Sequence, residues 1–109
     1  MIDRTDLLQG TLDLLILRTL KLGPTHGWAL SKRIHQLSSE VLQVNQGSLY
    51  PALYRLEDKG WISAAWGASE DGRRIKIYSL TPEGRRRSAD ERKAWKAFAG
   101  AVDRLLEST

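Results

Sequence analysis

Apolar residues recur at helical spacing through the first part of the chain. The segment from Thr5 to Leu22 has no proline, and Gly23-Pro24 ends its pattern. Its apolar positions are Leu7, Leu8, Leu12, Leu14, Leu15, Ile16, Leu17 and Leu20. At ~100° per residue these positions cover more than one face of a helix. We therefore expect a second surface, besides the core, to cover this first helix.

A second helix is predicted directly after the first. Thr25 is a suitable N-cap residue, and the helix is expected to run to about Ser38. Leu30, Ile34 and Leu37 are spaced four and three residues apart, so they form one stripe. This stripe is expected to be the buried side of the helix.

The third helix is predicted to begin after Ser48 and to end at Gly60. With Ser48 as N-cap, Pro51 occupies the N3 position, where its missing N–H has no helical partner to lose. Gly60 suits the left-handed residue that follows many helices. The inward side carries Leu49, Leu53 and Leu56. The outward side carries Pro51, Tyr54, Arg55 and Asp58, flanked by Ser48 and Tyr50.

A β-hairpin and a long helix complete the pattern. Trp61–Trp66 and Arg74–Leu80 are rich in β-branched and aromatic residues, and Gly67–Arg73 between them is typical of a turn. Thr81-Pro82-Glu83 then supplies an N-cap, a proline at N1 and an acid in the first turn of a helix that runs to about Glu107. Its apolar seam is Trp95, Phe98, Val102 and Leu105.

This element order predicts a mainly α fold with a β-hairpin wing. Three helices followed by a hairpin match a winged helix-turn-helix, in which the third helix can enter the major groove of DNA. We expect residues 1–80 to form this DNA-binding domain and residues 81–109 to form a C-terminal dimerisation helix. The apolar first helix and the seam of the last helix both favour a homodimer.

The charge of the chain is unevenly distributed. The net charge of the 109 residues is +4, and the segment from Trp61 to Arg87 contributes +3 of it, with six basic and three acidic side chains. A basic segment on a small domain indicates a polyanionic partner, although a solvated surface has the same composition.

Composition argues against several other classes of protein. The absence of cysteine excludes disulfides, zinc ribbons, iron–sulfur clusters and thiol catalysis. His26 and His35 stand at opposite ends of the second helix without a recognisable catalytic or metal motif, and glycine-rich phosphate loops are missing. We therefore expect no enzyme activity, no catalytic or metal-binding residue and no cofactor. No apolar run is long enough to span a membrane, and the N-terminus lacks a signal peptide's basic start, so a cytoplasmic location is expected.

Several motifs resemble one family. They are Gly47-Ser48-Leu49-Tyr50-Pro51-Ala52-Leu53-Tyr54-Arg55-Leu56-Glu57, Lys59-Gly60-Trp61-Ile62, Gly72-Arg73-Arg74-Ile75-Lys76-Ile77-Tyr78, Leu80-Thr81-Pro82-Glu83-Gly84 and His26-Gly27-Trp28. Over about residues 7–84 the chain resembles the PadR family of bacterial transcriptional regulators. The resemblance implies a homodimeric DNA-binding protein, usually a repressor, that senses a small aromatic ligand.

Candidate DNA contacts follow from the helix and the wing. They are Lys32, Arg33, Ser48, Tyr50, Pro51, Tyr54, Arg55, Arg73, Arg74 and Lys76. Basic side chains of the wing would contact phosphates, and hydroxyl groups of the third helix would contact bases. Tyr50 has the alternative of packing in the core, and Arg55 that of an internal ion pair. The run Arg85-Arg86-Arg87 either extends the basic surface or is simply solvated.

The remaining predictions concern the dimer and its ligand. The expected dimer interface consists of Leu8, Leu15, Trp95, Phe98, Val102 and Leu105. Two copies of Trp95 near a two-fold axis could line an aromatic cavity, or could simply fill the dimer core. A dimer would bind double-stranded DNA at an inverted repeat. The competing hypothesis is a winged helix that binds another protein and has no specific affinity for DNA.

Overall fold

A computed structural model describes residues 4–109, with side chains from Gly10 onward. Its elements are α1 (Arg4–Leu20), β1 (Thr25–His26), α2 (Gly27–Leu37), α3 (Gln46–Asp58), β2 (Ile62–Ala68), β3 (Arg74–Leu80) and α4 (Pro82–Ser108). The predicted fold class, mainly α with a β-hairpin wing, is confirmed. We call β2, β3 and the turn between them the wing.

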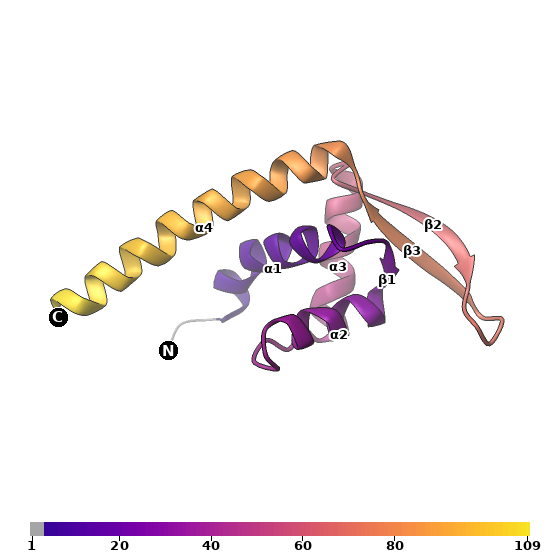
Figure 1. The fold of residues 1–109 in the computed structure, drawn as a ribbon, viewed down its shortest axis with the longest axis horizontal. Helices are drawn as coiled ribbons and strands as arrows, with labels where there is room; N and C mark the ends of the chain where they lie inside the picture. The colour runs from indigo at the N-terminus through magenta and orange to yellow at the C-terminus, as the bar shows by residue number, and fades with distance from the viewer. Residues whose placement is uncertain (1–3) are drawn as a thin grey trace.

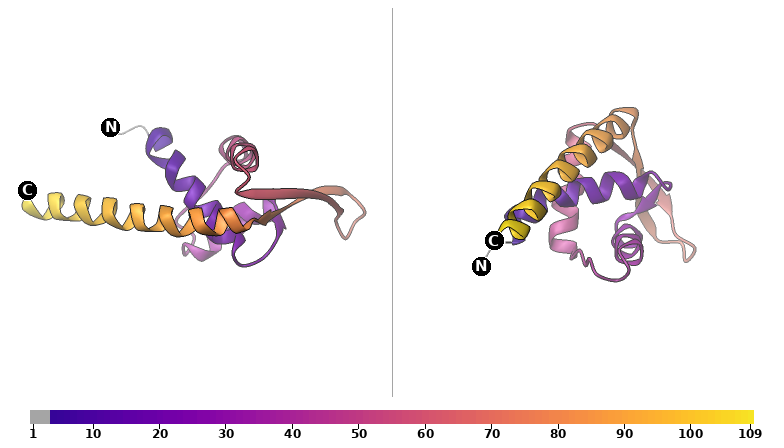
Figure 2. Two further views of the ribbon diagram at one scale, coloured as in Figure 1. Left: turned by 90° about the horizontal axis from the view of Figure 1, so that it is seen from above. Right: turned by 60° about the vertical axis from the view of Figure 1, so that its left-hand side comes forward.

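The molecule is elongated, with extents of 56 × 27 × 21 Å. Helices α1, α2 and α3 form its body, α4 passes beside α1 and extends beyond it, and the wing projects in the opposite direction (Figure 1). The two further views show the same separation of α4 from the wing (Figure 2). The wing and the helix expected to dimerise therefore occupy different ends of the molecule.

The core lies where α1, α2, α3 and the sheet meet. One side of α2 and one side of α3 supply it, whereas α1 is buried on more than one face, as its apolar positions predicted, because α4 also packs beside it. Its most deeply buried members are Ile16, Leu17, Leu30, Leu49, Leu53, Leu56, Ile62 and Tyr78, each at most 1% exposed. Leu37 is an exception, because its side chain is 62% exposed and lies at the edge of a surface cavity. The prediction that Leu37 completes a buried stripe was therefore wrong.

The start of α2 differs from the prediction. Thr25 and His26 form β1, which pairs antiparallel with Tyr78 and Ile77 of β3, so the sheet has the order β1-β3-β2. The N-cap is His26, whose Nδ1 accepts a hydrogen bond from the backbone N–H of Ala29 at 3.3 Å. Thr25 is one residue too early to be the N-cap, because the helix begins at Gly27 and His26 directly precedes it.

The start of α3 also differs from the prediction. Asn45, not Ser48, is the N-cap, and its Oδ1 accepts from the backbone N–H of Ser48 at 2.8 Å. The helix consequently begins at Gln46, and Pro51 lies within it. Pro51 therefore leaves the carbonyl of Gly47 without the N–H that residue 51 normally donates. The predicted end of this helix is confirmed, since Gly60 has φ of +76°.

The junction between the wing and α4 is tightly packed. Thr81 caps α4, as predicted, because its hydroxyl accepts from the backbone N–H of Gly84. A Cβ at Gly84 would lie 1.9 Å from the carbonyl oxygen of Trp61. Only glycine allows the two backbones to approach this closely, which fixes the direction in which α4 leaves the wing. Within residues 4–109, no helix has both the length and the apolar character needed to cross a membrane.

Candidate nucleic-acid interface

One face of α3 is directed to solvent. Ser48, Pro51 and Asp58 are exposed, and Tyr54 is 54% exposed, whereas the leucines of the helix are buried. Hydroxyl groups at Ser48 and Tyr54 can both donate and accept hydrogen bonds. This face therefore presents polar side chains of the kind that can contact base edges.

Tyr50 lies differently from its neighbours on α3. Its ring is half-buried and packs against the core. A Cβ at Gly27 would lie 2.8 Å from the Tyr50 hydroxyl, so the ring abuts the start of α2. The alternative of core packing describes Tyr50 in this structure.

Arg55 forms an ion pair within the chain. Its Nη2 donates to Oδ1 of Asp13 on α1 at 2.5 Å. Both side chains are largely enclosed, at 29% exposed for Arg55 and 12% for Asp13. The guanidinium therefore connects α3 to α1. This contact is the internal ion pair that the sequence analysis gave as the alternative for Arg55.

The register of the wing places its aromatic and basic side chains on one face. Ala64 pairs with Tyr78, Trp66 with Lys76 and Ala68 with Arg74. Paired residues share a face of a sheet, and residues two apart on a strand share it too. Tyr78 on this face is buried in the core, so the exposed part of the same face continues outward from α3.

Trp66 and Arg74 form an exposed aromatic and basic pair on this face. The Cζ atom of Arg74 lies 4.4 Å from the centroid of the Trp66 ring, and Trp66 is 60% exposed. A stacked guanidinium keeps its N–H groups available at the ring's edge. Arg74 is thus presented in a restricted orientation.

Lys76 is enclosed between the wing and α3. Its Nζ donates to Oε1 of Glu57 at 3.1 Å and lies 5.4 Å from the ring centroid of Tyr54. The hydrogen bond to Glu57 raises the pKa of Lys76 above its ordinary value. This lysine differs from the wing arginines because a carboxylate already compensates its charge.

The tip of the wing holds a second arginine. Arg73 is 83% exposed, and its Nε lies 3.3 Å from Oδ2 of Asp71. The Ser69 hydroxyl hydrogen-bonds Asp71 and lowers the pKa of that carboxyl. Ser69 Oγ also accepts from the backbone N–H of Arg73 at 3.0 Å, which orders the turn. An ion pair this exposed contributes little stability, so Arg73 can exchange Asp71 for a phosphate at small cost.

The two candidates on α2 have separate environments. Arg33 donates from Nη1 to the carbonyl of Gly23 at 3.1 Å, which holds the turn after α1. Lys32 is exposed, and its Nζ lies 5.0 Å from the centroid of the exposed Trp28 ring. Of the two, Lys32 is the one with an exposed side chain.

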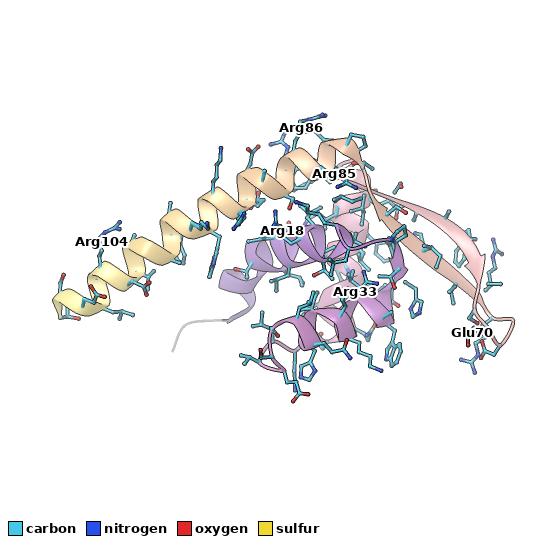
Figure 3. The ribbon with its side chains drawn as sticks, viewed as in Figure 1. Arg18, Arg33, Glu70, Arg85, Arg86 and Arg104 are labelled. Carbon is cyan, nitrogen blue, oxygen red and sulfur yellow. The ribbon has the colours of Figure 1, made fainter. Side chains whose placement is uncertain are left out.

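The basic run at the start of α4 lies apart from the wing tip. Figure 3 shows Arg85 and Arg86 beside the junction with the wing, whereas Glu70 marks the tip. Arg86 and Arg87 both pair with Glu83, and Arg87 also lies 5.2 Å from the centroid of the Trp61 ring. The hydrogen bond from Arg86 lowers the pKa of Glu83. These arginines therefore form part of a local network on α4.

The expected dimer seam lies mostly exposed on this single chain. Trp95 is 43%, Phe98 52% and Leu105 64% exposed, while Val102 is half-buried. The Trp95 and Phe98 ring centroids are 6.0 Å apart. Leu15 is half-buried against the core, and the side chain of Leu8 lies outside the described residues.

Surface cavities of about 340 and 360 Å³ lie on the body of the chain, and Trp95 lines neither of these. The first lies between α1 and α2, with Leu15, Leu22 and Leu37 among its lining residues. The second lies beside Trp28 and Lys32.

Trp28, Glu57 and Trp66 were not predicted from the sequence as parts of the interface. For Trp66, the available signal was its place in the hairpin: once Ile62 is opposite Leu80, Trp66 is opposite Lys76. Glu57 had no such signal, because its partner is 19 residues away on another element.

Comparison with known proteins agrees with this geometry. The model of the "Transcriptional regulator PadR-like family" matches residues 16–90. A transcriptional regulator from Clostridium thermocellum is similar in structure, with a TM-score of 0.84, 28% identity and coverage of 93% of this chain and 98% of that one. A PadR-like transcriptional regulator from Bacillus cereus gives a TM-score of 0.75 at 27% identity, covering 93% and 96%. A transcriptional regulator of Mycobacterium tuberculosis is 36% identical over 67 residues, 62% of each chain.

Proposed function

Since this chain belongs to the PadR-like family of transcriptional regulators, we propose that it controls transcription by binding double-stranded DNA as a homodimer. The observation that carries this proposal is that Tyr54 on α3 and the Trp66–Arg74 pair on the wing are exposed, with Lys76 between them, beside Tyr54 and paired with Trp66. Such an arrangement can enter one groove with the helix and reach the neighbouring backbone with the wing.

The residues divide into two roles. Phosphates are contacted by Arg73, Arg74 and Lys32, because all three side chains are exposed. Each phosphate that they neutralise releases a counterion from the DNA, and this release adds to the affinity. Ser48 and Tyr54 contact base edges from the outward face of α3, with Pro51 beside them. Tyr50, Arg33 and Arg55 support this surface from within through the contacts described above.

The dimer forms through α4 and α1. A single chain leaves Trp95, Phe98 and Leu105 largely exposed, and contiguous apolar side chains of this size mark an interaction surface. A partner would cover this seam together with Leu15, Val102 and Leu8. Residues 1–80 then serve as the DNA-binding unit and residues 81–109 as the dimerisation helix.

The dimer acts as a repressor, and a small aromatic ligand releases it from DNA. In the proposed dimer, the paired Trp95 and Phe98 rings of each chain border a flat apolar space between the subunits. A ligand there releases DNA only if it binds better to a dimer whose α3 spacing does not fit adjacent grooves. Quenching of Trp95 by planar aromatic compounds, in a chain with Trp28, Trp61 and Trp66 changed to Phe, tests this part. Without quenching, Trp95 only fills the dimer core.

The DNA-binding proposal is tested by selection from a randomised duplex library. We expect an inverted repeat whose half-sites are separated by one helical turn, about 34–36 Å. Footprinting of the selected duplex should protect both half-sites. Failure to retain any duplex at low salt would refute DNA binding and leave the protein-interaction hypothesis, while a single asymmetric half-site would refute the two-fold arrangement.

A further inference from the structure

Lys76 connects two elements that a DNA-binding winged helix must hold at a fixed angle. It lies on β3, whereas Glu57 and Tyr54 lie one turn apart on α3. Its Nζ is 3.1 Å from Oε1 of Glu57, 5.4 Å from the ring centroid of Tyr54 and 5.6 Å from that of Tyr78. The side chains of Lys76 and Glu57 are 28% and 34% exposed, so the contact is half-enclosed. One ammonium group thus bridges the wing and α3.

The same contacts make Lys76 a poor phosphate ligand. The Glu57 carboxylate already compensates its charge, and a phosphate would have to compete with that partner. Arg74 offers a direct contrast, because its guanidinium stacks on Trp66 and is exposed. Arg74 therefore adds positive charge to the proposed DNA-binding surface of the protein, whereas the ion pair of Lys76 with Glu57 adds almost none.

Lys76 also constrains a side chain that faces the DNA. Tyr54 is 54% exposed, so about half of this residue is open to solvent. The Lys76 ammonium lies within the distance of a cation–π contact with that ring. Removal of the ammonium would remove both its contact with the Tyr54 ring and the hydrogen bond that joins the wing to α3.

On the basis of the proposed DNA-binding function, we propose that Lys76 is a positioning residue that sets sequence specificity. Through Glu57 it fixes the angle between the wing and α3, and through the Tyr54 ring it fixes a base-reading side chain. It does not contact phosphate. Functional side chains require such support, because small displacements remove the geometry of their contacts.

The experiment compares charge variants of the full chain on the selected operator and on a scrambled duplex. Lys76→Glu should lower the ratio of the two affinities about tenfold, because Glu57 then faces another carboxylate. The exchanged pair Glu57→Lys/Lys76→Glu should recover part of the lost ratio, because it restores the bridge between β3 and α3 with reversed polarity but not the ammonium beside the Tyr54 ring. A phosphate-binding lysine cannot be replaced by glutamate in this way.

Two further measurements separate positioning from simple stability. Lys76→Met keeps the apolar stem and removes the ammonium, so it should alter preference at the same base positions as Tyr54→Ala. Its salt slope should equal that of the wild type, whereas Arg74→Ala should reduce the slope by about one unit. Circular dichroism and thermal unfolding identify variants that fold, and Lys76→Met carries the test if Lys76→Glu does not.

Two results would overturn the inference while leaving DNA binding intact. One is a slope for Lys76→Met that is about one unit lower than that of the wild type. The other is an exchanged pair that binds the operator as weakly as Lys76→Glu alone. Failure of the wild type to bind any duplex would instead overturn the proposed function, and the inference with it.

Discussion

Arg55 on α3 donates from Nη2 to Oδ1 of Asp13 on α1 at a distance of 2.5 Å. This contact joins the helix proposed to read DNA to the helix that runs beside α4. A side chain that could have contacted DNA therefore fixes α3 in the body of the protein.

The first prediction concerns this ion pair. Arg55→Met should lower the free energy of unfolding by about 2 kcal/mol, because it leaves the enclosed Asp13 carboxylate without its partner. The double variant Asp13→Leu/Arg55→Met should recover most of this loss, since no buried charge remains. Urea unfolding of the variants measures both effects. A loss of one salt-slope unit in Arg55→Met would instead show that Arg55 contacts phosphate.

The second prediction concerns pH. The hydrogen bond from Arg86 lowers the pKa of Glu83 in the folded chain. A carboxyl group with a lowered folded pKa stabilises the fold above its unfolded pKa and loses this contribution as the pH falls through the folded value. Glu83→Gln should therefore reduce the melting temperature at neutral pH, and the difference should shrink as the pH falls through the lowered pKa of the folded state. Glu107→Gln, at the other end of α4, is the control and should show no such pH-dependent loss.

The third prediction concerns the dimer. Val102→Asp places a charge in the expected seam of α4, where a partner would bury it without a counter-ion. This variant should sediment as a monomer at micromolar concentrations. Ala97→Asp adds the same charge outside the seam and should remain dimeric. A monomeric wild type would contradict the proposed interface.

The fourth prediction concerns Trp66. Trp66→Ala removes the ring on which Arg74 stacks, and the affinity for DNA should fall about tenfold. Trp66→Phe retains an aromatic surface and should lose less. Fluorescence anisotropy with the selected duplex measures both. Equal affinity of the wild type and Trp66→Ala would remove this pair from the interface.

The helices and the hairpin could be predicted because their signals are periodic and local. Leucine spacing identified α1 and α3, and Thr81-Pro82 identified the start of α4. β1 could not be predicted, because two residues carry no period and only their pairing with β3 defines them. The cap of α3 was misassigned because Asn45 and Ser48 are both good N-cap residues.

The candidate residues of the site could be chosen from the sequence, but the side chains that they contact within the protein could not. Exposed arginines in the turn of a hairpin have few alternatives to solvent or a ligand, so Arg73 and Arg74 could be chosen from the sequence. Lys76 has the same charge, but it meets Glu57 across elements 19 residues apart. Such pairing depends on how the wing packs on α3, which no local pattern specifies.

The most direct test of DNA binding through the wing is the salt dependence of the affinity for duplex DNA. For the wild type, the logarithm of the binding constant should fall linearly with the logarithm of the salt concentration, and Arg73→Ala/Arg74→Ala should reduce this slope by up to about two units. Arg92→Ala/Lys93→Ala removes the same charge from exposed positions on α4 and should leave the slope unchanged. Absence of binding at low salt, or equal slopes for the wild type and the wing variant, would contradict DNA binding through the wing.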